Sequence, residues 1–309
     1  SLDFGKVKTF FAGINPSWLV LLLVLIPLVL GVYIRMQPMD LHATDTWAQS
    51  TVYNYYRNSI LAQINQQYPN LPDAKKNELL QTQFDTFLKT QKAQLEPQIA
   101  DLSQRFKLEF KDDKGNNYMP DIDTYYWLRF IENINKNGNP GDEIRDGVPY
   151  DNHFQAPEGR PIERGEYFHI YLGYYFYKAL SLFNQSITPM IAFSYLPVFL
   201  SAICIILIFF ITKRIAGKTG GFFAALILAV VPYFVTKTGF GYADTDIEVV
   251  FFPLLITFLF MEAYESHKLI KTLILGVLAG LCAGIFSFTW SGWWYIFDFL
   301  MGATGLYLT

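Results

Sequence analysis

The sequence has few of the residues that form disulfide frameworks and zinc sites. Only two cysteines occur among its 309 residues, and both lie within apolar runs, at Cys204 and Cys282. The four histidines never approach one another at the spacing of zinc ligands. A disulfide scaffold and a zinc site are therefore not expected, and the cysteines are interpreted as small buried residues.

An excess of charge of one sign is also lacking. The 24 basic and 27 acidic residues give a net charge of -3, which says little about partners, and no nucleic-acid partner is expected. In contrast, 52% of the residues are hydrophobic and 17% aromatic, too apolar a composition for an ordinary soluble domain. Because 17% are charged, the chain is expected to combine a membrane part with a water-facing part.

Six apolar runs predict transmembrane helices. They cover residues 18–34, 189–211, 219–235, 249–263, 272–288 and 293–309. The first would form a helix about 26 Å long, at roughly 1.5 Å per residue, and would just cross a hydrocarbon core. The last run reaches the end of the sequence, so the chain is expected to be the N-terminal part of a longer transmembrane protein, without a C-terminal soluble domain.

The distribution of basic residues predicts the orientation of these spans. Lys6 and Lys8 precede the first run, and no cleavage site follows it, so an uncleaved anchor with a cytoplasmic N-terminus is expected. The basic stretches at 213–218 and 266–271 then fall in the cytoplasm, and residues 239–248 fall outside. The expected location is the cell membrane, with the acidic loops on the external face.

Residues 36–186 are predicted to form one large, mostly helical external loop. It includes a polar helical insertion at about 40–117, expected to pack on the membrane part, and an interfacial helix at 167–183. Residues 137–165 contain several prolines and glycines and are predicted to be loop. The expected fold class is all-α, a polytopic membrane helical bundle that carries this external loop.

Three carboxylates, those of Asp244, Asp246 and Glu248, lie between two apolar runs in the second external loop. No basic residue lies within residues 239–248 to neutralise them. Asp244 or Asp246 can cap the helix that follows. A carboxylate pair at the rim of a membrane bundle also invites a divalent cation, so the pattern predicts a metal site.

A second acidic pair, Asp121 and Asp123, precedes an aromatic run that predicts a helix. Capping of that helix can account for one of the two aspartates but not readily for both. Asp123 is therefore a candidate site residue.

Two short motifs carry less weight. The Gly-Lys-Thr at 217–219 resembles the end of a P-loop, but Thr212 stands where a glycine is required, and no strand precedes it. The Asn-Gln-Ser at 184–186 is an N-glycosylation sequon that would face outward, although a three-residue match often arises by chance.

Together these features resemble the membrane half of the catalytic subunit of oligosaccharyltransferase, of the single-subunit archaeal and bacterial type. The resemblance rests on an aspartate before an aromatic helix at the end of a long first loop, followed by Gly-Tyr-Ala-Asp-Thr-Asp at 241–246 and Phe-Pro-Leu at 252–254. It covers the chain except the polar block at about 40–117, which is treated as an insertion.

The resemblance implies a glycosyltransferase of the GT-C type. Such an enzyme transfers an oligosaccharide from a lipid-linked, polyprenyl (dolichol-type) phosphate donor to the asparagine amide of Asn-X-Ser/Thr in acceptor polypeptides, on the non-cytoplasmic face, with Mg²⁺ or Mn²⁺. Chemistry agrees, because the developing charge of the leaving phosphate needs a cation, and oxygen-rich sites suit these two ions. The implied partners are the donor, the acceptor and membrane lipid.

The resemblance also assigns roles to residues. Asp123 matches a metal ligand that faces the acceptor amide, and Asp244 and Asp246 match a metal ligand and its partner in the metal site. Lys237 stands where the family often has a basic residue, and the role assigned to it is binding of the donor phosphate. A lysine that extends to the membrane interface is an alternative explanation of nearly equal weight. Two residues are second choices, Asp121 and Glu248.

The family also uses a glutamate in a later external loop and a Trp-Trp-Asp motif in a C-terminal soluble domain, and this sequence contains neither. Tyr295 follows the Trp-Trp at 293–294, which is interpreted as part of a membrane aromatic belt. The chain alone is therefore expected to bind metal incompletely and to be inactive. Two alternatives stay open. A protein O-mannosyltransferase would use a hydroxyl acceptor, and an ion-coupled transporter would place acidic groups at mid-membrane and show internal repeats.

Overall fold

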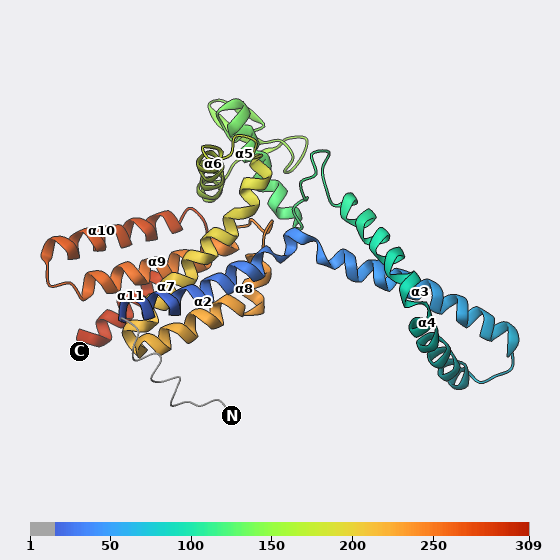
Figure 1. The fold of residues 1–309 in the computed structure, drawn as a ribbon. Coiled ribbons are helices and arrows are strands. Elements are labelled where there is room, and N and C mark those ends of the chain that lie inside the picture. Colours follow the sequence, from blue (N-terminus) through green and yellow to red (C-terminus); the bar gives the residue numbers. More distant parts are fainter. Residues whose placement is uncertain (1–15, 309) are drawn as a thin grey trace, which may run out of the picture. The chain divides into compact units, whose positions relative to one another are not determined.

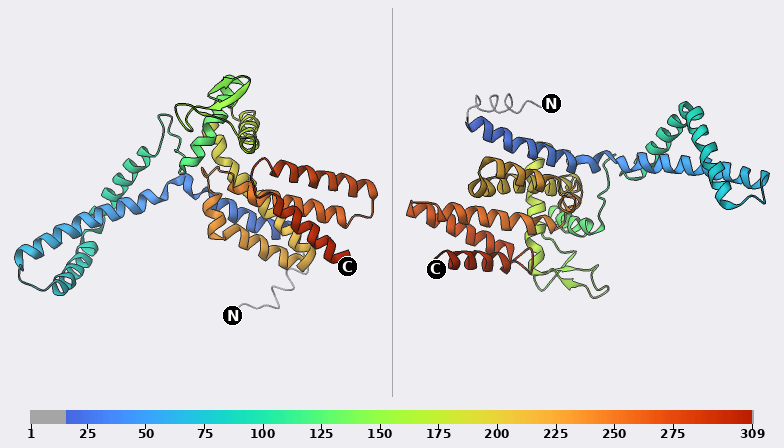
Figure 2. Two further views of the ribbon diagram at one scale, coloured as in Figure 1. Left: turned by 180° about the vertical axis from the view of Figure 1, so that it is seen from behind. Right: turned by 90° about the horizontal axis from the view of Figure 1, so that it is seen from below.

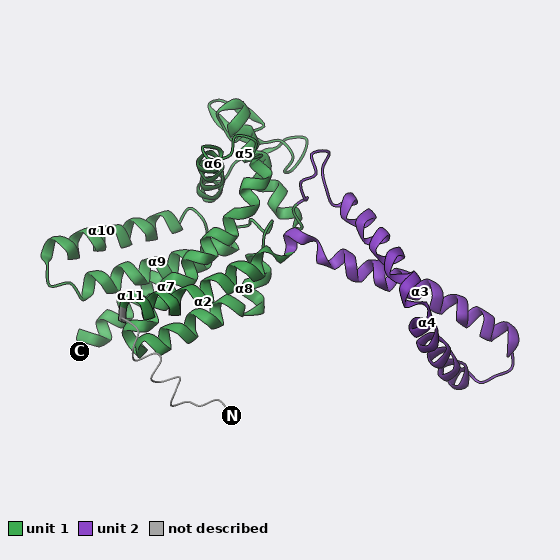
Figure 3. Cartoon of the chain, viewed as in Figure 1, with its two compact units in different colours: residues 1–37, 119–309 green, residues 38–118 purple. Residues whose placement is uncertain are grey.

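The computed structural model describes residues 16–308 and is mostly helical (Figure 1). The chain divides into two units (Figure 3). The first contains residues 1–37 and 119–309, and the second contains residues 38–118. Every residue of the two acidic pairs and of the Asp-Thr-Asp stretch lies in the first unit.

The second unit is a helical hairpin. A short 3-10 helix, η1 (Gln37–Asp40), leads into it, and its two helices are α3 (His42–Gln67) and α4 (Asp73–Glu109). Ile64, Leu80 and Leu95 are buried in it. The unit has nearly the bounds of the predicted polar insertion, and its packing against the membrane part stays a prediction.

Four helices of the first unit are long and apolar enough to cross a membrane. They are α2 (Pro16–Met36), α7 (Pro189–Val230), α9 (Asp246–Tyr264) and α10 (Leu269–Phe286). Helix α2 continues directly into η1. The chain is therefore a multi-pass membrane protein, and the predicted fold class is confirmed. The positions of Lys6 and Lys8, used to orient the first span, lie outside the described residues.

Helix α7 holds two of the predicted spans. Its backbone leaves the helical region at Ala216 and Gly217, where Gly217 has a φ of 71°, so that two helical arms meet at this point. The second arm ends at Val230, earlier than the sequence predicts. The reason is Pro232, which lacks a backbone N–H and begins a separate short helix, α8 (Pro232–Lys237).

The spanning helices pack through small and aliphatic residues. Helix α2 lies beside α7 (Figure 2), where Ile205, Ala225 and Ala229 are buried. A Cβ atom on Gly31 would lie 2.5 Å from Ile205 Cδ1, so a larger residue would force the Ile205 side chain to move. The last described helix, α11 (Trp294–Leu308), occupies the sixth predicted span up to the end of the described residues.

The part of the first unit between α2 and α7 carries two further helices and a small sheet. In order, these elements are α5 (Ile122–Asn137), β1 (Glu143–Arg145), β2 (Val148–Asp151), β3 (Arg160–Pro161), the 3-10 helix η2 (Arg164–Glu166) and α6 (Tyr167–Ser181). The strands are antiparallel in the order β1-β2-β3. The prediction of loop for residues 137–165 is therefore wrong in part.

The missed sheet has an identifiable local cause. Arg145 pairs with Val148, which leaves Asp146 and Gly147 as a two-residue turn with φ values of 51° and 82°. Positive φ at both positions is typical of the turn that closes a tight hairpin, and Asp-Gly is among its preferred sequences. The strands themselves are too short to give an alternating apolar pattern.

The core of this region joins α5 and α6 to α7. Phe130 and Ile131 of α5, Ile170 of α6 and Phe193 of α7 have no exposed surface. Gly173 allows the close approach, since a Cβ there would lie 2.4 Å from Ile131 Cδ1. This packing fixes the beginning of α5 beside the segment that precedes α9.

Candidate active site

The segment of residues 238–245, between α8 and α9, is here called the acidic loop, and it is held by backbone hydrogen bonds to distant elements. The Phe240 N–H donates to the carbonyl of Arg35 at the end of α2, at 2.8 Å. The Gly241 N–H donates to the carbonyl of Ser194 in α7, at 3.0 Å. Because these partners belong to two membrane-spanning helices, the acidic loop is fixed on their common end.

Gly241 also brings the loop against the beginning of α5. Its φ is 86°, and a Cβ atom there would lie 2.6 Å from Cδ of Pro120. Its carbonyl lies 3.3 Å from the hydroxyl of Thr124, a buried side chain in the first turn of α5 that also donates to the Asp121 carbonyl at 2.8 Å. Only glycine fits here, and the two segments that carry the predicted aspartates are thus side by side.

Asp244 is bound directly by α5. The indole Nε1–H of Trp127 donates to Asp244 Oδ1 at 2.9 Å, and the Thr245 N–H donates to the same oxygen at 2.7 Å. Trp127 lies one helical turn after Asp123, on the same face of α5. The segment that carries Asp244 is therefore in contact with the helix that carries Asp123.

Asp121 and Asp123 have different surroundings. Asp121 is the N-cap residue of α5, and its side chain accepts from the Asp123 N–H at 3.3 Å. Asp123 is exposed, and no hydrogen-bond donor to its carboxylate is found among residues 16–308. Capping thus accounts for Asp121 and leaves the Asp123 carboxylate available to a ligand.

Asp246 differs from the expectation of an unneutralised cluster. Lys237 Nζ lies 2.8 Å from Asp246 Oδ2, and this hydrogen bond and the carboxylate charge raise the pKa of Lys237. The lysine lies outside residues 239–248, and no local sequence pattern indicates the pairing. The capping prediction is also wrong, because Thr245 occupies the N-cap position of α9 and makes no side-chain cap.

A buried pair lies beneath the acidic loop. His169 Nδ1 is 2.8 Å from Glu248 Oε1, and neither side chain is exposed. His169 Nε2 lies 3.4 Å from the Ala243 carbonyl, and the imidazole packs edge-on against the Trp127 ring at 4.9 Å. Burial opposes protonation, but the charge and hydrogen bond of Glu248 outweigh it and raise the pKa of His169. Each imidazole nitrogen thus faces an oxygen that can accept a hydrogen bond, an arrangement that favours the protonated ring.

Arg35 holds the other side of the loop. Its buried guanidinium donates from Nε to Thr238 Oγ1 at 2.7 Å and from Nη1 to the Gly31 and Ala229 carbonyls at 3.0 and 2.9 Å. Neither Arg35 nor His169 is among the predicted site residues. The available signal was a charged or titratable side chain, at the end of the apolar run 18–34 for Arg35 and within the aromatic stretch 167–183 for His169.

The chemistry of the three aspartates fits a hard divalent cation, because every donor is a carboxylate oxygen. The described hydrogen bonds to Asp244 all use Oδ1, which leaves Oδ2 open. However, Asp123, Asp244 and Asp246 are not one of the clusters whose ligand atoms all lie within 4.8 Å of one another. Their convergence on one ion stays a prediction.

The cluster that meets this distance among residues 16–308 is Asp142, Asp151 and His153. It already contains a cation, because Arg129 donates from Nη1 to Asp142 Oδ2 at 2.6 Å and from Nη2 to Asp151 Oδ1 at 2.7 Å. The guanidinium neutralises the two carboxylates and joins α5 to the small sheet. We interpret this cluster as structural.

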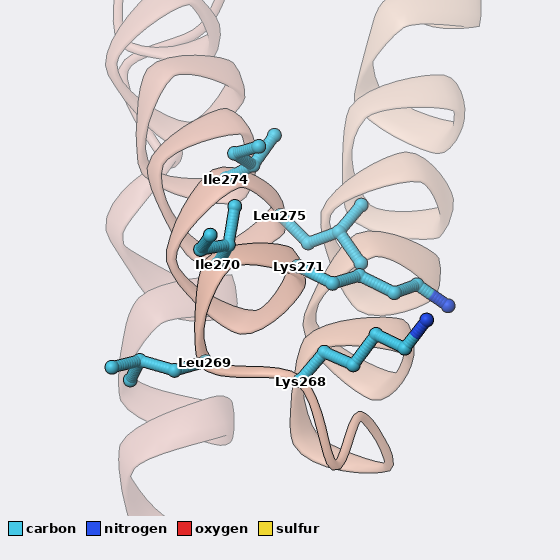
Figure 4. A pocket seen from close by; sticks show the side chains of 6 residues that line it. All are labelled: Lys268, Leu269, Ile270, Lys271, Ile274 and Leu275. Carbon is cyan, nitrogen blue, oxygen red and sulfur yellow. The ribbon is translucent and has the colours of Figure 1, made fainter.

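A surface hollow of about 790 Å³ lies at the beginning of α10, where Lys268 and Lys271 extend to the same side (Figure 4). Helix α9 begins at Asp246 and ends at Tyr264, shortly before this hollow. The hollow is therefore at the opposite end of α9 from the acidic loop and is not part of the candidate site.

Comparison with known proteins gives a consistent result. A family model described as oligosaccharyl transferase STT3, N-terminal, matches residues 92–309. A Methanococcus voltae protein named dolichyl-phosphooligosaccharide-protein glycotransferase is 33% identical over 215 residues, which is 65% of this chain and 23% of that protein. A Methanocaldococcus jannaschii protein of the same name is 33% identical over 189 residues, 57% of this chain and 20% of that protein.

The chain thus spans about a fifth to a quarter of the length of these curated relatives. A crystal structure of the Archaeoglobus fulgidus oligosaccharyltransferase in the apo form matches with a TM-score of 0.50 and 21% identity, covering 60% of this chain and 22% of that chain. This likeness concerns the fold. The family match begins within α4 and leaves α2 and α3 outside it.

Proposed function

We propose a function from the premise that this chain belongs to the oligosaccharyl transferase STT3 family. The full-length protein is a membrane glycosyltransferase that transfers an oligosaccharide from a polyprenyl, dolichol-type phosphate donor to the asparagine amide of Asn-X-Ser/Thr. The names of the two curated relatives support the reaction class and the lipid carrier. The activity is assigned to the longer protein, because this chain spans only part of its relatives.

The hydrogen bond from Trp127 to Asp244 is the observation that carries this proposal, together with the Thr124–Gly241 contact. These contacts bring the beginning of α5 and the Asp-Thr-Asp stretch together, although the sequence separates them by more than a hundred residues. A site that must bind both an acceptor amide and a phosphate leaving group needs such a meeting of acidic segments.

Asp123 is assigned to the acceptor. A carboxamide nitrogen is a poor nucleophile because its lone pair is conjugated with the carbonyl. An exposed carboxylate that accepts its N–H bonds weakens that conjugation and orients the lone pair toward the sugar. The new bond joins the asparagine nitrogen to the sugar carbon, the bond between that carbon and the phosphate oxygen breaks, and the amide nitrogen loses one proton.

Asp123, Asp244 and Asp246 are the residues proposed to hold Mg²⁺ or Mn²⁺, and Asp121 and Glu248 are second choices. When bound, such an ion would supply positive charge for the leaving phosphate. Lys237 is proposed to supply a second positive charge to the phosphate. Its contact with Asp246 supports a position beside the acidic loop. To bind phosphate, the Lys237 ammonium would have to contact the Asp246 carboxylate and the phosphate at the same time.

The external face is proposed for this site. The acidic loop lies at the beginning of α9, and the basic stretch at 266–271 follows the end of the same helix. Since a spanning helix separates its two ends, the lysines and the aspartates would face opposite sides of the membrane. The excess of basic residues in cytoplasmic loops then places the aspartates outside.

The test is a transfer assay with the full-length protein in membranes, a lipid-linked oligosaccharide and a fluorescent peptide. A peptide containing Asn-X-Thr should be glycosylated, and its Asn→Gln version should not. A chelator should abolish transfer, and added Mn²⁺ or Mg²⁺ should restore it. Transfer to the serine or threonine of a peptide without asparagine would overturn the proposal in favour of an O-glycosyltransferase.

A further inference from the structure

The Asn-Gln-Ser sequon at 184–186 lies in the connection between α6 and α7. It is the only Asn-X-Ser/Thr sequence in the 309 residues in which X is not proline, since the Asn-Pro-Ser at 15–17 does not qualify as a sequon. All three of its residues are exposed. An acceptor asparagine must be reachable by an enzyme, and this one meets that condition.

The side chain of Asn184 leaves its reactive atom available. Its Oδ1 accepts from the Ser186 N–H at 3.1 Å and from Ser186 Oγ at 2.7 Å. No described residue accepts a hydrogen bond from Asn184 Nδ2, which is the atom that would be glycosylated. The hydroxyl that defines the sequon therefore already contacts the carboxamide, and the amide nitrogen faces no competing partner.

The sequon lies at the same end of α7 as the candidate active site. Thr188 caps α7 by accepting from the Ile191 N–H at 3.3 Å. Ser194, whose carbonyl accepts from Gly241 of the acidic loop, follows about 9 Å further along the helix axis at 1.5 Å per residue. An enzyme whose site lies beside Gly241 therefore faces the membrane side on which Asn184 is displayed.

The connection is too restrained for Asn184 to enter the site of its own chain. The Asn184 N–H donates to the Leu180 carbonyl at 3.0 Å, and the Ile187 N–H donates to the Asn184 carbonyl at 3.2 Å. Reaching Asp123 would require this turn and the adjoining ends of α6 and α7 to unfold. A second copy can approach the exposed turn from outside without that cost.

We propose that Asn184 is itself an N-glycosylation site, modified by a second copy of the protein. The inference rests on the proposed function and adds a macromolecular acceptor, the enzyme itself. The sugar carbon of the lipid-linked donor forms a bond to Asn184 Nδ2, and its bond to the phosphate oxygen breaks. The lipid phosphate leaves with the electron pair of that bond, and the proton lost by the amide nitrogen passes to a carboxylate of the active copy and then to water.

The test uses full-length chains expressed in host cells that supply the lipid-linked donor. A tagged, inactive Asp244→Ala chain is produced alone and together with an untagged active chain, and its glycopeptides are measured by mass spectrometry. The glycan should occupy Asn184 of the tagged chain only when the active chain is present. Asn184→Gln and Ser186→Ala should abolish the modification, whereas Ser186→Thr, which keeps the sequon, should retain it.

A sequon peptide assayed in the same membranes separates the two claims. Transfer to the peptide with a bare Asn184 would overturn this inference and leave the proposed function standing. A glycan found on the active chain but never on the inactive one would overturn modification by a second copy. Loss of both transfers in the active chain would overturn the proposed function and this inference with it.

Discussion

Trp127 donates its indole N–H to Asp244 at 2.9 Å and at the same time packs its ring against His169. One aromatic side chain thus connects the helix that carries Asp123 with the carboxylate of the acidic loop and with the buried pair beneath it. Because the indole is held on both sides, the orientation of the Asp244 carboxylate is fixed before any ligand binds. This makes Trp127 a positioning residue, and its removal tests the arrangement directly.

Trp127→Phe keeps an aromatic ring and removes only the N–H donor. A hydrogen bond to a charged group contributes about 1.5–3 kcal/mol, so transfer by the full-length protein should fall roughly tenfold or more. The measurement is the initial rate of peptide glycosylation at equal protein amounts. Trp47→Phe, in the separate unit of residues 38–118, is the matched control and should leave the rate unchanged; equal rates for the two variants would contradict the role of Trp127.

Asp123→Ala should abolish transfer while leaving expression and the melting temperature nearly unchanged, because this carboxylate is exposed. Asp244→Ala should also abolish transfer but should lower the melting temperature, because the Trp127 indole and the Thr245 N–H lose their acceptor. Asp121→Ala serves as the comparison. It removes the N-cap of α5 and should cost about 1 kcal/mol of stability with activity largely retained. Undiminished glycosylation in either of the first two variants would remove that residue from the site.

Gly241→Ala should impair both stability and transfer. The φ of 86° strains any residue with a side chain, and the added Cβ would contact Pro120 at 2.6 Å, so a loss of about 2 kcal/mol or more is expected. Gly276→Ala in α10 is the control, since nothing lies within 4 Å of its Cβ position and alanine favours helix. Thermal unfolding in detergent measures both, and an equal melting temperature for both variants would argue against the packed turn.

The His169–Glu248 pair predicts a dependence of stability on pH. Because the folded-state pKa of His169 is raised, its contribution is complete below the unfolded value of about 6.5 and is lost as pH rises through the folded value. His169→Ala should therefore destabilise the protein most at low pH, and by about 3 kcal/mol or more, since Glu248 is left buried without a partner. The double variant with Glu248→Ala should lose less than the sum of the two single changes, and additive losses would show that the side chains do not interact.

The orientation of the chain is tested by cysteine labelling in intact cells, with Cys204 and Cys282 replaced by alanine. Cysteines are introduced at Lys114, in the exposed turn after α4, and at Ala216, where the two arms of α7 meet. A membrane-impermeant maleimide should label position 114 from outside and position 216 only after the cells are opened. The reverse result would overturn the proposed sidedness.

Sequence patterns predicted the elements that are defined locally. Long apolar runs indicated the spanning helices. The Asp121–Asp123 pair indicated a capped helix with a second aspartate that capping does not require. The residues that hold the acidic loop could not be found this way. Arg35 and Thr238 are 203 positions apart, and His169 and Glu248 are 79 apart, so no local pattern records their pairing. The Lys237–Asp246 contact was missed for a different reason, because it depends on how the chain turns between α8 and α9.

The hydrogen bonds of Arg35 have a consequence for how the protein is made. The first membrane helix is synthesised and inserted long before Thr238 and Phe240 leave the ribosome. Until then, Arg35 lacks the partners that these two residues supply. The acidic loop can reach its folded conformation only after it has been synthesised and has contacted α2, which is made first. Incorrect placement of the first helix would therefore change the positions of the carboxylates in the acidic loop, although none of the residues assigned to the reaction belongs to that helix.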